Sequence, residues 1–158
     1  MIFSNNLTGK IKTKKTDIVR VNLAWVNFQQ ARQILKKRKN VFLDYPSGRT
    51  KPPKPTITFK QAIDLANEFN VKYFAVSNLE SVEKIKELKA KVKSEIVPKI
   101  ETTEGVKNIA KIAKEVKTIM LDKDDLWVDC KGKNFSRMVK KVRSCKIKVF
   151  ELAGVIFI

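Results

Sequence analysis

Lys99 and Glu101 are the residues whose type and spacing most directly suggest chemistry. They lie in a run rich in β-branched residues, 97–101, that is typical of a strand. Side chains two positions apart on a strand point to the same face, so this cation and anion should lie side by side. Catalytic groups of β/α barrels occupy this position, at the carboxyl end of a strand that leads into a helix. The alternative is a solvated ion pair at a strand end, which would do little.

Hydrophobic periodicity divides the chain into alternating strands and helices. The strands predicted from this pattern are 18–23, 41–44, 72–76, 97–101, 118–121 and 147–150, with at most a further short strand at 2–3. Thr58 and Gln61 form a capping box that starts one of the helices. The segment 45–55 holds four of the five prolines and is predicted to be an irregular connection.

This order of elements predicts βαβ units and a parallel sheet. An open doubly wound sheet and a partial or reduced TIM-type β/α barrel both fit the pattern. The sequence contains no Gly-rich phosphate loop, and its five glycines argue against a dinucleotide fingerprint. At 158 residues we expect a single domain spanning 1–158.

Polar side chains gather at the predicted carboxyl ends of these strands: Arg20, Asn22, Asp44, Ser77, Lys99, Glu101 and Asp125. Glu101 and Asp125 are the carboxylates that a hard divalent cation such as Mg²⁺ prefers. Lys99 could stabilise an enolate or a transferred phosphoryl group, and Arg20 could bind a phosphate or carboxylate bidentately. The sequence has no histidine, so a general base must be Lys, Asp, Glu, Tyr or metal-bound water. Alternatively, the parallel strands simply end in polar residues.

Five segments resemble motifs of the pyruvate kinase barrel domain, and together they cover about residues 18–150. Residues 20–22 resemble the family's Arg-x-Asn strand, and 42–48 resemble its Leu-Asp strand. Residues 74–77 resemble Ala-x-Ser-Phe, and 120–128 resemble Met-Val-Ala-Arg-Gly-Asp-Leu-Gly-Val. Residues 98–106 are the most specific, because they resemble Ala-Lys-Ile-Glu-x-x-Glu-Gly-Val. This last motif is shared with citrate-lyase and HpcH-type aldolase relatives.

The resemblance implies a role for each matching position. Lys99 would lie at the transferred phosphoryl group, Arg20 would bind phosphate, and Ser77 is a further candidate for contact with the substrate. Glu101 and Asp125 would hold Mg²⁺ or Mn²⁺. A monovalent cation such as K⁺ would lie near Asn22, Asp44 and Tyr45.

The chain also departs from the family pattern. Ala24 replaces a serine ligand of the monovalent cation, and Trp25 replaces a histidine. Lys123 and Asp124 stand where Arg-Gly is usual, and Ala153 lies near the position of the family's proton-delivering threonine. Residues 49–55 span the point where the family inserts its lid domain, and neither a C-terminal regulatory domain nor an eighth strand is expected. These departures argue against phosphorylation of ADP, while Mg²⁺ and an oxo-acid remain expected.

Three functional hypotheses follow. The first is a pyruvate kinase-like, phosphotransferase-type enzyme that binds Mg²⁺ and a phosphoenolpyruvate- or pyruvate-like acid, with phosphoryl transfer through an enolate. The second is an HpcH/citrate-lyase-type aldolase or lyase. The third is a non-catalytic basic barrel remnant that acts as a binding or assembly module.

The composition sets expectations for partners and location. The net charge of +18 suits a small anionic phospho- or oxo-acid and keeps nucleic acid open as a partner, although the basic residues are not interleaved with aromatic ones. No apolar run reaches membrane-spanning length, and no signal peptide is recognisable, so we expect a cytoplasmic protein with reduced Cys130 and Cys145. The exposed edges of an incomplete barrel predict a homo-oligomer.

Overall fold

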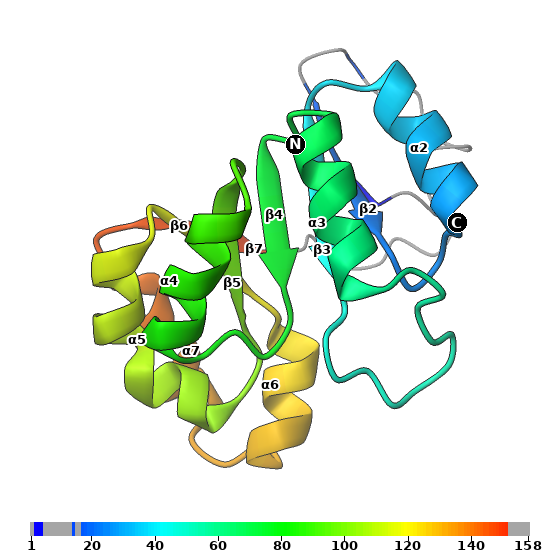
Figure 1. Ribbon diagram of the computed structural model, residues 1–158. Helices are drawn as coiled ribbons and strands as arrows, with labels where there is room; N and C mark the ends of the chain where they lie inside the picture. Colours follow the sequence, from blue (N-terminus) through cyan, green and yellow to red (C-terminus); the bar gives the residue numbers. More distant parts are fainter. Residues whose placement is uncertain (1, 5–13, 15–16, 152–158) are drawn as a thin grey trace.

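Parallel strands form a single curled sheet in the computed structural model, which describes residues 2–4, 14 and 17–151. The strands are β1 (Ile2–Ser4), β2 (Ile18–Asn22), β3 (Val41–Tyr45), β4 (Tyr73–Val76), β5 (Glu95–Ile100), β6 (Thr118–Leu121) and β7 (Lys148–Glu151). Their order in the sheet follows their order in the sequence (Figure 1). The arrangement confirms the partial TIM-type β/α barrel.

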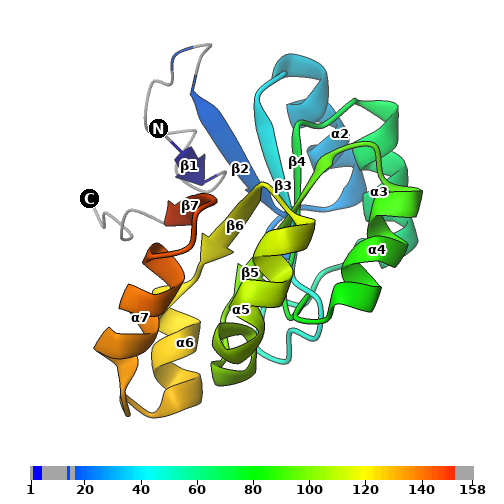
Figure 2. The same cartoon turned by 90° about the vertical axis from the view of Figure 1, so that its left-hand side faces the viewer.

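Helices connect successive strands and cover the outer face of the sheet (Figures 1 and 2). They are α2 (Phe28–Lys37), α3 (Phe59–Glu68), α4 (Val82–Lys91), α5 (Thr103–Glu115), α6 (Lys123–Cys130) and α7 (Phe135–Arg143). The predicted capping box starts α3, since Thr58 accepts from the Gln61 N–H and the Gln61 side chain accepts from the Thr58 N–H. In the described part of the chain, no helix is long and apolar enough to cross a bilayer.

The curl of the sheet is visible in its inner aromatic cluster. Phe150 on β7 lies 5.7 Å from Phe42 on β3 and 5.3 Å from Tyr73 on β4, measured between ring centroids. Since β7 is far from β3 in strand order, these rings meet only because the sheet bends round on itself (Figure 2). The inner face is therefore a packed core towards the amino ends of the strands, as in a complete barrel.

Alternation along each strand separates this inner face from the outer one. On β3, Val41 and Leu43 pack outward under the helices, while Phe42 faces inward. The next inward position on β3 is Asp44, and its neighbour Asn22 pairs with it in register on β2. The inward positions thus change from apolar to polar towards the carboxyl ends, which gives one end of the barrel its charged residues.

The short strand allowed at 2–3 is present as β1, which has three residues and pairs in parallel with β2. The sequence pattern did not predict α6, because only Leu126 and Cys130 of this helix are buried and its apolar pattern is weak. β5 begins at Glu95 and ends at Ile100, so Glu101 lies one residue beyond it. The apolar residues 154–158 at the end of the sequence lie outside the described residues.

Glu151 ties the end of β7 to two helices. Its carboxylate accepts from Arg143 Nε at 2.6 Å and Nη2 at 2.8 Å, and Lys123 Nζ lies 3.3 Å away. The hydrogen bond from Arg143 is the main cause that lowers the pKa of Glu151 to about 2; burial opposes it, and Lys123 adds to it.

Glu151→Gln should lower the free energy of unfolding by less than about 1 kcal/mol, since the pair is largely solvent-exposed. The pKa of Glu151 is lower in the folded chain, so its contribution is complete above about pH 4.5 and disappears as the pH falls through about 2. Urea unfolding of both proteins at pH 7 and pH 2 measures this, and an unchanged difference at pH 2 would contradict it.

Candidate functional site

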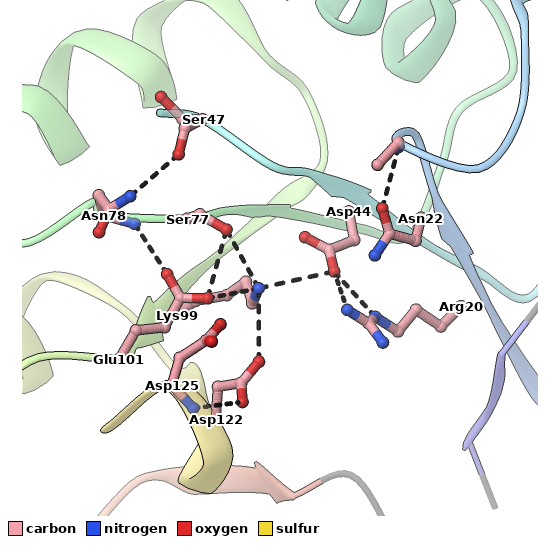
Figure 3. A network of polar contacts seen from close by, with 11 residues as sticks. Arg20, Asn22, Asp44, Ser47, Ser77, Asn78, Lys99, Glu101, Asp122 and Asp125 are labelled. Carbon is pink, nitrogen blue, oxygen red and sulfur yellow. Dashed lines mark hydrogen bonds and ion pairs between the residues drawn. The ribbon is translucent and has the colours of Figure 1, made fainter. Parts of the chain in front are cut away.

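A pocket of about 470 Å³ opens at the carboxyl ends of the strands. The residues predicted from the sequence that line it are Arg20, Asn22, Ser77, Lys99, Glu101 and Asp125. Asp44 is completely buried beside them and forms an ion pair with Arg20. The structure therefore brings together most of the residues that the sequence singled out, from β2, β3 and β5, from the connections after β4 and β5, and from the first turn of α6 (Figure 3).

Lys99 lies at the centre of this group. Its Nζ is 2.5 Å from Glu101 Oε1, 3.7 Å from Asp122 Oδ2 and 3.8 Å from Asp44 Oδ2 (Figure 3). The ammonium also donates to Ser77 Oγ at 3.1 Å. Only 4% of Lys99 and 5% of Glu101 is exposed, so the pair is not the solvated one considered above.

Residues that follow β4, the strand beside β5, hold Glu101 in place. Ser77 Oγ donates to Glu101 Oε1 at 3.3 Å, and the Asn78 N–H donates to Oε2 at 3.2 Å. Asn78 has a left-handed backbone, with φ of +56°, which asparagine tolerates better than most residues. Its side chain donates to the Ser47 carbonyl at 2.9 Å, which fastens the loop after β3 to the same corner.

Arg20 and Asp44 form the second buried ion pair. Both Nε at 2.8 Å and Nη2 at 2.5 Å of Arg20 donate to the single oxygen Oδ2 of Asp44. The other oxygen, Oδ1, is buried and accepts no hydrogen bond from any residue that the structure describes. A buried carboxylate oxygen without a partner is costly, so it marks a place for a water molecule or a cation.

Three carboxylates face one another at the mouth of the group. One oxygen each of Glu101, Asp122 and Asp125 lies within 4.8 Å of the others. Asp125 is exposed and lies in the first turn of α6 rather than at a strand end, and its N–H donates to Asp122 Oδ1 at 3.4 Å. Oxygen ligands at this spacing suit Mg²⁺ or Mn²⁺.

Sequence reasoning missed Asp122. A signal was present, because Asp122 directly follows the predicted strand 118–121 and stands three residues before Asp125, a spacing typical of a helix N-cap. Asp122 caps α6 with its side chain and also lines the pocket, so it is both a helix cap and a candidate metal ligand.

The charges of the group do not balance. Arg20 and Lys99 face the four carboxylates of Asp44, Glu101, Asp122 and Asp125, so two negative charges are left over when all are ionised. This excess is unexpected in a chain of net charge +18. This group of six side chains therefore attracts cations, and a single divalent cation would neutralise it, while Arg49, Lys51 and Asp129 line the rest of the pocket.

The proton affinities of the central pair follow from these neighbours. Burial opposes the charged form of Lys99, but the attraction of Asp44, Glu101 and Asp122 outweighs it and raises the pKa of the ammonium above its ordinary value. Burial raises the pKa of Glu101, although Lys99 acts in the opposite direction. Lys99 thus remains a cation at neutral pH and acts as a hydrogen-bond donor, not as a base.

Contacts with Glu80 explain two residues of the Thr-Thr-Glu-Gly segment that follows Glu101, Thr102 and Gly105. Thr102 caps α5 by accepting from the Gly105 N–H, and its hydroxyl donates to Glu80. A Cβ on Gly105 would lie 2.7 Å from Glu80 Oε1, so a larger residue there would displace the Glu80 side chain. The glycine thus leaves room for the Glu80 side chain that accepts from Thr102.

Of the residues named for a monovalent cation, Asn22 lines the pocket and Tyr45 does not. The Tyr45 ring packs against Phe59 at a centroid distance of 5.0 Å, and Tyr45 is not among the residues that line the pocket. Asn22 lines the pocket, and its Oδ1 accepts from the Ala24 N–H at 3.0 Å. Tyr45 faces away because it is one residue out of step with the inward-facing Asp44.

Lys99→Met should destabilise the fold by about 3–5 kcal/mol, because it leaves buried carboxylates without their cation. The pKa of Glu101 should then rise further, so the variant should recover stability relative to the parent protein as the pH is lowered from 7.5 to 5. Urea unfolding at both pH values measures this. Lys107→Met, on the exposed face of α5, serves as the control and should cost less than about 0.5 kcal/mol. A loss below 1 kcal/mol for Lys99→Met would contradict the central role of the pair.

Comparison with known proteins supports the resemblance noted in the sequence. The chain is 33% identical over 97 residues to a pyruvate kinase from Methanocaldococcus jannaschii, a match that covers 58% of this chain and 22% of that protein. No protein-family profile matches the chain.

Solved structures show the same fold. The crystal structure of macrophomate synthase superposes with a TM-score of 0.62 at 14% sequence identity, covering 86% of this chain and 63% of the other. The chain is thus a partial β/α barrel with sequence similarity to pyruvate kinase, and it spans about a fifth of the length of the curated relative that it matches.

Proposed function

We propose that this protein binds Mg²⁺ together with a phosphoenolpyruvate- or pyruvate-like acid and stabilises the enolate of that acid. The observation that carries the proposal is the excess of two carboxylates around the buried Lys99, at the floor of an open pocket in a strongly basic chain. The similarity to a pyruvate kinase supports the choice of acid.

The residues fit a divalent cation. Glu101, Asp122 and Asp125 offer oxygen ligands within 4.8 Å of one another, and oxygen is the ligand that Mg²⁺ and Mn²⁺ prefer. When bound, such an ion supplies positive charge that polarises the oxygens of the acid. Like charges at this spacing repel, so an ion also removes an unfavourable interaction from the folded chain.

Each remaining side chain has a role in holding the acid. Lys99 stays protonated and can donate a hydrogen bond to an oxygen on which negative charge develops. Arg20 lines the pocket, with its guanidinium plane fixed by Asp44, and attracts a carboxylate or phosphate. Ser77 keeps the Lys99 ammonium and the Glu101 carboxylate in their relative positions through hydrogen bonds to both.

A site for K⁺ receives less support. The unpartnered oxygen of Asp44 fits a cation, but Ala24 offers no hydroxyl and the Tyr45 ring packs in the outer layer. We therefore propose the divalent site alone.

Phosphoryl transfer to ADP is the narrower form of the proposal. The connection between β3 and α3 is a loop, 46–58, braced by Arg49, which donates to the carbonyls of Pro52 and Pro53. This loop lines the pocket through Ser47, Gly48 and Arg49. It is too short to form a domain that closes over a nucleotide, so the enolate step is the broader and better supported activity.

Mg²⁺ should raise the melting temperature of the protein, and Asp125→Asn should abolish that rise. Asp125 is exposed, so the substitution should change the stability of the metal-free protein by less than about 0.5 kcal/mol. Thermal unfolding with 0 to about 10 mM Mg²⁺ measures this. Asp124→Asn is the matched control, since it removes the same charge from the same helical turn but lies outside the pocket. An equal Mg²⁺ response in both variants would contradict the site.

Pyruvate incubated with the protein and Mg²⁺ in D₂O should exchange its methyl protons: a pocket carboxylate or a water molecule takes up the methyl proton as the enolate forms, a deuteron returns from solvent, and no nucleotide is needed. The exchange rate, followed by proton NMR, should fall about a hundredfold in Asp125→Asn and stay unchanged in Asp124→Asn. A parallel assay of pyruvate formation from phosphoenolpyruvate and ADP tests the narrower form. The absence of both activities, together with a normal Mg²⁺ response, would leave a binding function and refute the proposed chemistry.

A further inference from the structure

Lysines mark the end of the barrel opposite the pocket. Each described connection from a helix to the next strand contains an exposed lysine, and none contains an aspartate or glutamate. These lysines are Lys39 after α2, Lys72 after α3, Lys93 after α4, Lys117 after α5 and Lys146 after α7. We call them the amino-end lysines.

The parallel topology places these residues on one surface. In a parallel β/α sheet every helix-to-strand connection lies at the amino ends of the strands, and the pocket lies at the carboxyl ends. Figure 2 shows this, with the amino end uppermost and the loop that lines the pocket at the lower end. The amino-end lysines thus lie at the opposite end of the barrel from the acidic group around Lys99.

Neighbouring residues extend this surface. Further exposed lysines stand in the last turns of the helices and at the start of β7: Lys36, Lys37, Lys91, Lys114 and Lys148. The carboxylates nearest to the connections are already engaged. Glu68 binds Arg32, Glu95 accepts from Thr118, and Glu115 lies near Lys86 and Lys89.

Helix dipoles account for only part of the pattern. A cation in the last turn of a helix is favoured by about 0.3–1 kcal/mol, which explains residues such as Lys91. The effect falls off beyond the last turn, so it gives little reason for lysines at the far side of a connection, such as Lys72 and Lys146. A surface with a lysine in every described helix-to-strand connection, and with the neighbouring Glu68, Glu95 and Glu115 engaged by other residues, suits a partner with many negative charges.

The surroundings of the lysines indicate which polyanion fits. The large hydrophobic side chains that are most exposed in the described residues, Trp25, Phe59, Trp127 and Val128, all belong to the carboxyl-end connections or the helices that start there. Among the residues described at the amino end, no aromatic ring is mostly exposed for the bases of a single strand to stack on, and apolar side chains such as Phe69 and Ile147 are at least half-buried, which leaves little to enter a membrane. What it offers is a set of cations for phosphates.

We propose that the amino-end lysines bind the phosphate backbone of double-stranded nucleic acid, without reading its bases. Lysine ammonium groups neutralise phosphates as point charges, and backbone contacts carry no sequence information. The affinity should depend strongly on salt, because each neutralised phosphate releases counterions. This surface is separate from the pocket, so it can act whether or not the proposed chemistry is correct.

The test uses the full chain, a fluorescent 20-base-pair DNA duplex and anisotropy at a series of salt concentrations. The triple variant Lys39→Gln, Lys93→Gln, Lys117→Gln should bind at least about tenfold more weakly at 50 mM salt. The slope of log K against log salt should become shallower by about 2 to 3, about one unit for each lost contact. A second duplex of unrelated sequence should give the same affinity.

The matched control is Lys54→Gln, Lys107→Gln, Lys133→Gln, which removes the same charge from exposed positions at the other end of the barrel. An equal loss in both triple variants would show that only net charge matters and would overturn the proposal. Preferential binding of a single strand, or of vesicles containing phosphatidylserine, would also overturn it. Asp125→Asn should leave duplex binding unchanged, which separates this surface from the proposed metal site.

Discussion

The buried Lys99–Glu101 ion pair is the constraint on which the site depends. Removing two charges from water costs several kcal/mol for each ion, and the cost is recovered only with good geometry and further hydrogen bonds. Here Ser77 bonds both partners, and the Asn78 N–H completes the carboxylate. A buried ion pair held in this way does not by itself indicate high stability, since an apolar pair of similar size would satisfy the fold at lower cost. Its presence therefore indicates that the site needs these charges for its function.

The curl of the sheet makes this pair possible. In a flat sheet the inward faces of β3 and β6 would stand far apart, and Lys99 could not approach both Asp44 and Asp122. The contact between Phe42 and Phe150 shows that the inner face closes over an apolar floor. Polar side chains above such a floor are shielded on one side and open to solvent on the other. Their mutual interactions are therefore strong, while a ligand can still reach them.

Much of this arrangement follows from the sequence. The strand pattern put Asp44 at the carboxyl end of its strand and Lys99 with Glu101 on a common face, and alternation of strands and helices predicted the parallel sheet. Burial could not be predicted, because whether a Lys/Glu pair at a strand end meets solvent depends on the neighbouring strands. Asp122 was missed because α6 was missed, and α6 buries only Leu126 and Cys130. The pairing of Arg20 with one oxygen of Asp44 also depends on register, which local sequence does not specify.

The electrostatic division of the molecule has a consequence for the order of binding in the proposed site. At about 4 Å, two unit charges interact by about 4 kcal/mol at the effective dielectric constant of a protein surface. An anionic acid that enters alone meets more carboxylates than cations around Lys99, so its binding is opposed locally even though the chain as a whole attracts anions. A divalent cation reverses this balance. The long-range field of the lysines then favours the approach of the acid, while Arg20 and Lys99 determine where it stops. Binding of the cation and of the acid should therefore be positively coupled, because each reduces the charge that opposes the other.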